Sequence, residues 1–261
     1  MSPAALARRK TAMPVLAVAG LAWAFMVIRF GNPSLSPDSC CVPVFPFGTP
    51  SPESVGLVLL RNSPQMLVAS WALMLVAMMT PMLANPLRHV LDRSFAQRRA
   101  RSVFLFLVAY FGIWMFSGIV ILSLVLMVRL LIPNPLAQVA AVGTLACVWQ
   151  CSPAKQVCLN RAHALPELAA FGWAADRDAL RFGFNHGDWC IGSCWAVMWF
   201  AEVCSIGHLT AMAFVTLWVL AEHLEKPTPP RWRVRLPVKA VRLLSGQVRI
   251  FVLAHKGALA Q

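Results

Sequence analysis

The sequence predicts an all-α fold, a polytopic membrane helix bundle with about six transmembrane helices and both termini in the cytoplasm. Of the 261 residues, 59% are hydrophobic and only 13% are charged, which is unlike the composition of soluble domains. The apolar residues gather in runs that reach the ~20 residues needed to cross a bilayer, alone or with their uncharged flanks. These runs cover residues 13–28, 66–84, 103–128, 136–148, 189–204 and 209–221.

The basic residues set the expected orientation of these helices. The net charge is +13, and Arg and Lys gather in the N-terminal segment, in residues 85–102 and 152–188, and after Glu225. The other connecting segments hold few of them. This alternation places both termini and the two basic connections in the cytoplasm, beside the anionic lipids of the inner leaflet. No recognition-helix or basic-aromatic sheet pattern accompanies the charges, so nucleic acid is not an expected partner.

Two regions follow from this organisation. Residues 1–226 form the expected six-helix membrane domain, and residues 227–261 form a basic cytoplasmic or interfacial tail. The first apolar run follows basic residues, as in a signal peptide, but further spans follow it instead of a soluble domain, so we expect a retained helix.

The segment 29–65 is rich in proline and is expected to be an external loop without regular helix. It contains Cys40 and Cys41, which are adjacent and therefore bridge each other poorly. Capture of an external metal and a structural or free-thiol role both stay open for these two cysteines.

The second expected helix, residues 66–84, has a methionine face. Met74, Met78 and Met82 are four residues apart and fall on one side of a helix. Pro81 weakens the last turn and frees the carbonyl of Ala77, which must then find a partner. Methionine is also an ordinary packing residue, so the face alone does not establish a site.

The third and fourth expected helices differ in character. Residues 103–128 read as a scaffold helix, in which Tyr110 requires a hydrogen-bond partner and Gly112 and Gly118 permit close helix contact. Residues 136–148 lead into Gln150 and Lys155 at the cytoplasmic end. Lys155 can stabilise a neighbouring thiolate, or it can extend toward water as interfacial lysines do.

The fifth expected helix carries a sulfur stripe. Cys190, Cys194 and Met198 are four residues apart, and His186 precedes them by one more turn, with Asp188 between. Thiolate and thioether favour soft ions such as Cu(I). The alternative is that small polarizable side chains simply pack there.

A possible second site lies further along the same helix. Glu202 is an intramembrane acid, and His208 follows it on the external half. About 12 residues separate Glu202 from Cys190, or roughly 18 Å along a helix, which is too far to share one ion. The pair can relay protons, receive a metal, or be a neutral packing pair.

Three motif blocks in this chain resemble a family of bacterial multi-helix membrane proteins described as predicted metal-binding integral membrane proteins. The resemblance spans about residues 66–226, and its blocks are Ala77-Met78-Met79-Thr80-Pro81-Met82, Pro153-Ala154-Lys155 with Cys158-Leu159, and residues 183–198. It implies a multi-pass protein of the bacterial inner membrane that binds metal. The family pattern has a second cysteine shortly after Cys158 and a cysteine in place of Ser193. Either His163 substitutes as a ligand, or the affinity for metal is weaker than in the family or lost.

These observations favour a soft-metal protein, copper first, that handles, delivers or transports the ion near the cytoplasmic face. Its expected partners are membrane lipids and a metal donor or acceptor protein or a membrane complex. The alternatives are a scaffold or assembly subunit without metal and a thiol-redox enzyme, which the absence of a Cys-x-x-Cys motif disfavours. The expected ligands are Cys158, Cys190, Cys194, Met78, Met82, Met198, His186 and His163, with Gln150, Lys155 and Asp188 as supporting polar groups.

Overall fold

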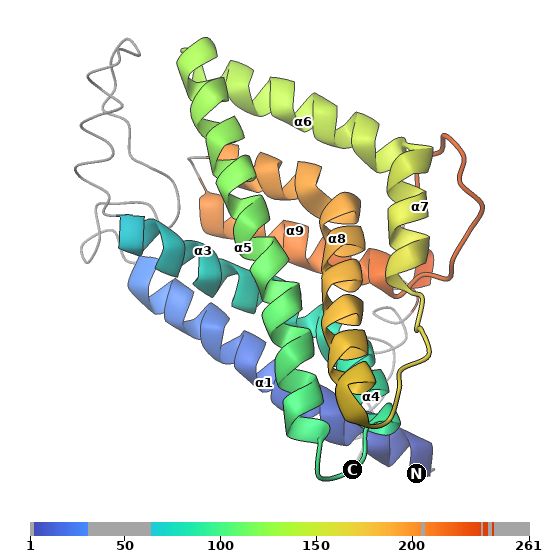
Figure 1. Ribbon diagram of the computed structural model, residues 1–261. Coiled ribbons are helices and arrows are strands. Elements are labelled where there is room, and N and C mark those ends of the chain that lie inside the picture. Colours follow the sequence, from blue (N-terminus) through green and yellow to red (C-terminus); the bar gives the residue numbers. More distant parts are fainter. Residues whose placement is uncertain (1–2, 31–63, 205–206, 236, 240–241, 243–261) are drawn as a thin grey trace, which may run out of the picture.

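The computed structural model describes residues 3–30, 64–204, 207–235, 237–239 and 242, and shows helices but no strand within them (Figure 1). The all-α prediction is therefore confirmed for this part of the chain. The predicted external loop, with Cys40 and Cys41, and the end of the predicted tail lie outside the described residues. The elements are α1 (Pro3–Phe30), α3 (Pro64–Met79), the 3-10 helix η1 (Thr80–Leu83), α4 (Ala84–Arg93), α5 (Arg99–Leu131), α6 (Pro135–Cys151), α7 (Pro153–Ala162), α8 (Gly172–Val203) and α9 (His208–His223).

Three segments of the described chain are long and apolar enough to cross a membrane: Thr11–Arg29, Gln65–Arg93 and Arg99–Leu131. They correspond to the first three of the six predicted spans. The fourth predicted span falls in α6, which is apolar but has only 17 residues, and the sixth falls in α9, with 16 residues. The fifth predicted span forms the second half of α8, whose first half carries several charged residues.

The helix ends divide into two groups (Figure 1). The C-terminal ends of α1, α5 and α8 and the N-terminal ends of α3, α6 and α9 lie on the left of the view. The opposite ends of α6 and α9 lie at the right, beside α7, and α4 lies below them. Helices of alternating direction that gather their ends in this way are consistent with insertion across a bilayer.

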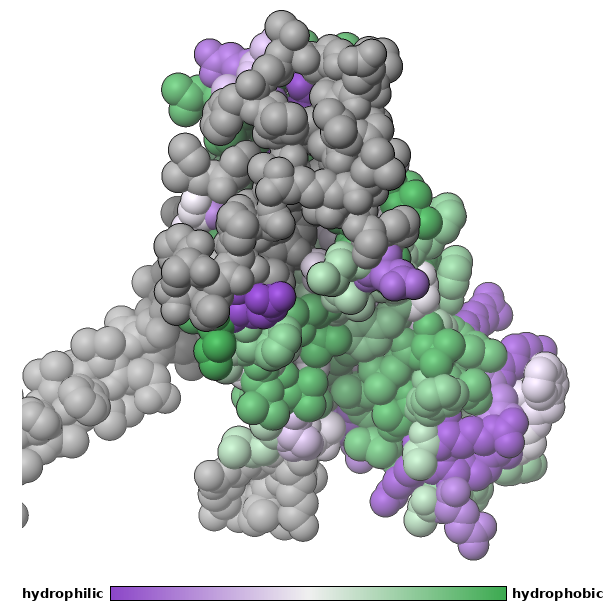
Figure 2. Space-filling model, turned by 90° about the vertical axis from the view of Figure 1, so that its left-hand side faces the viewer, coloured by the Kyte–Doolittle hydropathy of each residue, from purple (hydrophilic) through white to green (hydrophobic). Residues whose placement is uncertain are grey.

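Apolar side chains remain exposed on the outer helices. Leu21 on α1 is 71% exposed, and Phe116 and Ile119 on α5 are 67% and 65% exposed. Figure 2 shows a broad apolar surface on one face, with hydrophilic residues gathered at its lower right. Apolar surface of this extent marks contact with lipid or protein.

Pro81 ends α3, as the sequence predicts. The helix stops at Met79, and Pro81 stands at the start of the 3-10 helix η1. The Ala77 carbonyl, which loses its partner because proline has no N–H, accepts a hydrogen bond from Trp23 Nε1 at 3.1 Å. The break in α3 thus ties this helix to α1.

The contact between α5 and α8 is the most extensive among the described helices, and glycines permit it. A Cβ atom on Gly183 would lie 2.3 Å from the Phe106 carbonyl oxygen, and one on Gly187 would lie 2.5 Å from Ile113 Cγ2. Neither position has room for a side chain. Gly118 likewise allows α5 to approach α3 closely, because a Cβ atom there would lie 2.3 Å from Trp71 Nε1. The expected close contact is confirmed at Gly118 and is wrong for Gly112, where a Cβ atom would meet nothing within 4 Å.

The junction between α6 and α7 is encoded locally. Ser152 is extended, its hydroxyl accepts a hydrogen bond from the Lys155 N–H at 3.1 Å, and Pro153 takes the first helical position. Ser followed by Pro is a strong signal for the start of a helix. This junction turns the chain so that α7 packs along α8 and carries Lys155 and Cys158 toward it.

Candidate metal site

Two thiols form the centre of the candidate site. The side chains of Cys190 and Cys194 are 0% and 1% exposed and both are free. The Cys190 Sγ atom lies 3.4 Å from the Tyr110 hydroxyl of α5. The Cys194 thiol donates to the Cys190 carbonyl at 3.0 Å. Tyr110 therefore has the partner that its buried position requires, and that partner is a thiol of the predicted site.

The backbone at these thiols carries extra hydrogen bonds. The Cys190 carbonyl accepts from the Ser193 hydroxyl at 2.8 Å as well as from the Cys194 thiol. Trp149 Nε1 of α6 donates to the Gly192 carbonyl at 3.1 Å. Side chains that bond back to the preceding turn bend helices, and Figure 1 shows α8 changing direction along its length.

His223, the last residue of α9, contributes an imidazole that sequence reasoning missed. Its Nδ1 lies 3.0 Å from the Val219 carbonyl, so Nδ1 carries the proton and Nε2 keeps its lone pair. The Nε2 atom is buried and has no hydrogen-bond partner among the described residues, while the ring interacts electrostatically with Cys190. A ring held in this way by a carbonyl is the usual arrangement of a metal-binding histidine.

His186, which the sequence does predict, approaches the same thiol. It is 5% exposed, and its ring centroid lies 5.8 Å from those of Tyr110 and Phe182. Its Nε2 is likewise buried and lacks a hydrogen-bond partner within the described chain, and the ring interacts with Cys190. The rings of His186 and His223 thus both interact with Cys190, the first thiol of the pair.

A cavity of about 410 Å³ leads to this cluster. Its wall includes Met82 from η1 together with His89, His163, His186 and His223. His163 has both ring nitrogens near carbonyls, 2.7 Å from that of Leu159 and 3.0 Å from that of His223. Its nitrogens are therefore engaged by the backbone, whereas Met82 presents a free thioether.

The structure places Cys158 against a different face of α8. A Cβ on Gly192 would lie 2.7 Å from Cys158 Sγ, and Gly192 points about 200° around the helix from Cys190 and from Cys194. Asp188 and Arg161 are the charged neighbours of Cys158. Burial and the Asp188 carboxylate raise the pKa of this thiol, and Arg161 opposes them.

The remaining predicted sulfurs are packed in the core. Met78 is fully buried, and Met198 is buried one turn beyond Cys194. Both belong to the same apolar cluster as the two thiols.

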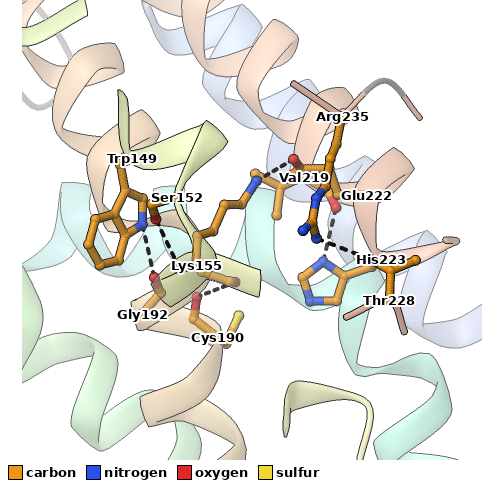
Figure 3. A network of polar contacts seen from close by, with 11 residues as sticks. Trp149, Ser152, Lys155, Cys190, Gly192, Val219, Glu222, His223, Thr228 and Arg235 are labelled. Carbon is orange, nitrogen blue, oxygen red and sulfur yellow. Dashed lines mark hydrogen bonds and ion pairs between the residues drawn. The ribbon is translucent and has the colours of Figure 1, made fainter. Parts of the chain in front are cut away.

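Lys155 reaches the site from α7 (Figure 3). It is 3% exposed, forms an ion pair with Glu222 of α9, and interacts electrostatically with Cys194. Burial lowers the pKa of Lys155, and the Glu222 carboxylate opposes this shift. Gln150 lies nearby in the wall of a second cavity with these two residues. Glu222 is the second residue that sequence reasoning missed.

Glu202 lies about three turns beyond Cys190 in α8, and His208 begins α9. Both are buried, and His208 Nδ1 is 2.9 Å from the Ala201 carbonyl. Arg129 of α5 interacts electrostatically with both side chains. The possible second site thus contains a cationic side chain that the sequence analysis did not consider.

The donor atoms fit a soft ion. Among the described residues no three His, Cys, Asp or Glu side chains are arranged to hold one ion together. Copper(I), unlike Zn²⁺, does not require four such ligands, and it favours the thiolate and thioether donors found here. The unpartnered Nε2 atoms of His186 and His223 are buried polar groups whose desolvation a bound ion would offset.

The signals for the missed residues are weak in sequence. Glu222 and His223 end an apolar helix, where interfacial polar residues are common. Glu222 is four residues from Trp218 and His223 is four residues from Val219, and only this spacing indicates the helix face on which each lies. No partner on α7 or α8 can be inferred from α9 alone.

Comparison with known proteins agrees with this chemistry. A family model described as PpoB2, copper chaperone, matches residues 68–245, which include all the helices around the site. No curated protein and no solved structure matches the chain. Since the family model covers well over half of its length, the chain belongs to the PpoB2 copper chaperone family.

Proposed function

We propose that this protein binds Cu(I) between Cys190 and Cys194 and hands it on at the cytoplasmic side of a bacterial inner membrane. The observation that carries the proposal is the buried thiol pair with two unpartnered imidazole nitrogens beside it. A dry pocket with soft donors favours Cu(I) over harder ions. Tyr110 and the core methionines exclude water from the ion.

The proposal assigns different roles to the surrounding residues. Cys190 and Cys194 are the primary ligands, and His223, His186 and Met82 are the donors that take the ion as it enters or leaves. The histidine-lined cavity supports this order, because it connects these donors to the surface near α4. Cys158, on another face of α8, is outside the primary ligand set of this proposal.

The proposed membrane arrangement has six crossings with both termini in the cytoplasm. The three long apolar segments, the basic connections and the grouping of helix ends support it. In this arrangement α7, the C-terminal end of α9 and the residues after α9 lie at the cytoplasmic side, where a soluble or membrane-bound acceptor protein can reach the ion.

Copper analysis of the detergent-purified protein tests the proposal. Reduced protein loaded with Cu(I) and desalted is expected to retain about one ion per chain. The variant with Cys190→Ser and Cys194→Ser is expected to retain little, whereas Cys147→Ser, which removes an exposed cysteine, is expected to behave as the parent. Stoichiometric copper in the double variant would exclude these two ligands.

The scaffold alternative makes a different prediction in the same experiment. If the sulfurs only pack, the parent protein retains no copper above the level of the double variant. The thiol-redox alternative is tested by alkylation, because Cys190 and Cys194 would then become resistant to reaction after mild oxidation and reactive again after reduction.

A further inference from the structure

We propose that the cavity between α7, α9 and the return segment, residues 226–235, binds a small anionic thiol that carries Cu(I) to the site. This inference rests on the proposed function. The cavity has a volume of about 470 Å³, within the range of small-molecule sites. Its wall includes Lys155, Glu222 and Arg235.

The return segment is held firmly over α7. The Asn160 side chain donates to the Thr228 carbonyl at 2.8 Å and accepts from the Thr228 N–H at 3.3 Å. The Arg233 N–H donates to the Cys151 carbonyl, at the end of α6, at 3.1 Å. These bonds fix both ends of the segment, so the cavity beneath it is a formed site.

Positive charge dominates the cavity wall. Lys226, Arg231 and Arg233 are exposed along the return segment. The wall holds two carboxylates, fewer than its five cations: Glu222 is paired with Lys155 and also attracts Arg235, and Glu225 accepts a hydrogen bond from the Lys239 N–H. Basic side chains gathered around a concave surface attract anions.

Arg235 is the best-placed cation of this group. Its guanidinium donates to the Thr228 hydroxyl at 3.1 Å and to the carbonyls of Pro229 and Arg231 at 3.2 Å each. These three acceptors are neutral oxygens, so they orient the guanidinium without cancelling its charge. Burial and the neighbouring Arg233 lower the pKa of Arg235, which a bound carboxylate would relieve. A fixed guanidinium is suited to binding a carboxylate with two hydrogen bonds.

Lys155 and Glu222 link the cavity to the thiol pair. Both residues line the cavity, where they form an ion pair (Figure 3), and both interact electrostatically with Cys194. His223 follows Glu222 directly and interacts with Cys190. A ligand seated in the cavity therefore lies against side chains that interact with both thiols.

The copper chemistry selects a thiol as the ligand. A carrier with two thiolates bound to Cu(I) exchanges them stepwise: each Cu–S bond to the carrier breaks as one to Cys194 or Cys190 forms. Each protein thiol gives its proton to the departing carrier thiolate, so two free carrier thiols are released and copper stays Cu(I). The carrier must also be anionic to match Arg235, and the apolar residues Leu159 and Val238 accommodate its hydrocarbon part.

The test compares an anionic and a neutral copper donor. Cu(I)–glutathione and Cu(I)–acetonitrile are each mixed with the reduced, detergent-purified full chain, and protein-bound copper is measured over time. Arg235→Gln is expected to slow loading from Cu(I)–glutathione by about tenfold and to leave loading from Cu(I)–acetonitrile unchanged. Arg177→Gln, which removes an exposed arginine outside the cavity, is the matched control. Equal rates for Arg235→Gln and the parent with Cu(I)–glutathione would overturn the inference.

A competitor provides a second, independent readout. S-methylglutathione keeps the carboxylates but cannot bind copper as a thiolate, so it is expected to inhibit loading from Cu(I)–glutathione and not from Cu(I)–acetonitrile. Absence of this inhibition overturns the inference while leaving the copper site intact. If the neutral donor fails to load the parent protein, the proposed function itself fails.

Discussion

Gly183 offers the sharpest test of how α8 is held against α5. A Cβ atom there would lie 2.3 Å from the Phe106 carbonyl oxygen, whereas real Cβ contacts essentially never fall under 3.0 Å. The obstacle is backbone, which cannot rotate away as a side chain can. Gly183→Ala must therefore push α8 and α5 apart.

The magnitude follows from two opposing effects. Alanine is favoured over glycine inside a helix by about 0.5–1 kcal/mol. Overpacking of a tight contact costs about 1–3 kcal/mol. The net expectation is a loss of up to about 2.5 kcal/mol of unfolding free energy for Gly183→Ala, or up to about 10 °C in Tm at about 2–4 °C per kcal/mol.

Gly112→Ala is the matched control, because Gly112 lies in α5 and a Cβ there meets nothing within 4 Å. In Gly112→Ala only the higher helix propensity of alanine acts, without overpacking, so we expect Tm to rise or stay level. Thermal unfolding of both variants in detergent, followed by the far-UV signal, gives the comparison. If Gly183→Ala is as stable as Gly112→Ala, glycine does not set the spacing of α5 and α8, and the reasoning is refuted.

Three further predictions concern single contacts. Lys155→Met leaves the Glu222 carboxylate buried without its cation and is expected to cost about 3–5 kcal/mol of unfolding free energy. Adding Glu222→Leu to this variant should restore most of the lost stability, and a double variant as unstable as Lys155→Met would contradict the pairing. The pKa of Cys158 is raised, so its alkylation by iodoacetamide, followed by mass spectrometry, should need a more alkaline solution than that of a free thiol. Asp188→Asn should shift the pH dependence of this alkylation toward lower pH, and an unchanged pH dependence would count against Asp188 as a cause of the raised pKa. Trp71→Phe removes the buried indole hydrogen bond that ties α3 to α5 at 3.2 Å and is expected to lower Tm by the equivalent of about 1–3 kcal/mol, whereas an unchanged Tm would show that this bond adds nothing.

Local structure proved predictable wherever one residue acts on its immediate neighbours. Pro81 ends α3 because proline lacks an N–H, and the freed Ala77 carbonyl finds a donor as expected. The Ser152-Pro153 pair starts α7 by an equally local signal, although we expected a connecting segment there. The spacing of Cys190 and Cys194 on one helix places their side chains on one face, and the structure buries both.

The composition of a candidate site depends on how separate helices dock, which spacing within one helix does not determine. His223 and Glu222 reach the thiols only because the end of α9 packs near α7 and α8. Cys158 is drawn to the Gly192 face because α7 approaches α8 from that side. The sequence predicts the depth of each of these residues in a bilayer but not the rotation of their helices.

By itself, the amino-acid sequence determined that this protein is helical and apolar, that its basic residues lie in connecting segments, and that soft donors recur near particular helix ends. Hydrophobicity, proline geometry and the 3.6-residue period act within a segment, so these properties can be read from the chain. Only the tertiary structure decided which donors meet. The approach of α5 and α8 through Gly183 and Gly187, and the return of the chain over α7, involve surfaces far apart in sequence. The shape of those surfaces, and not any local pattern, places His223 and Lys155 beside Cys190 and Cys194.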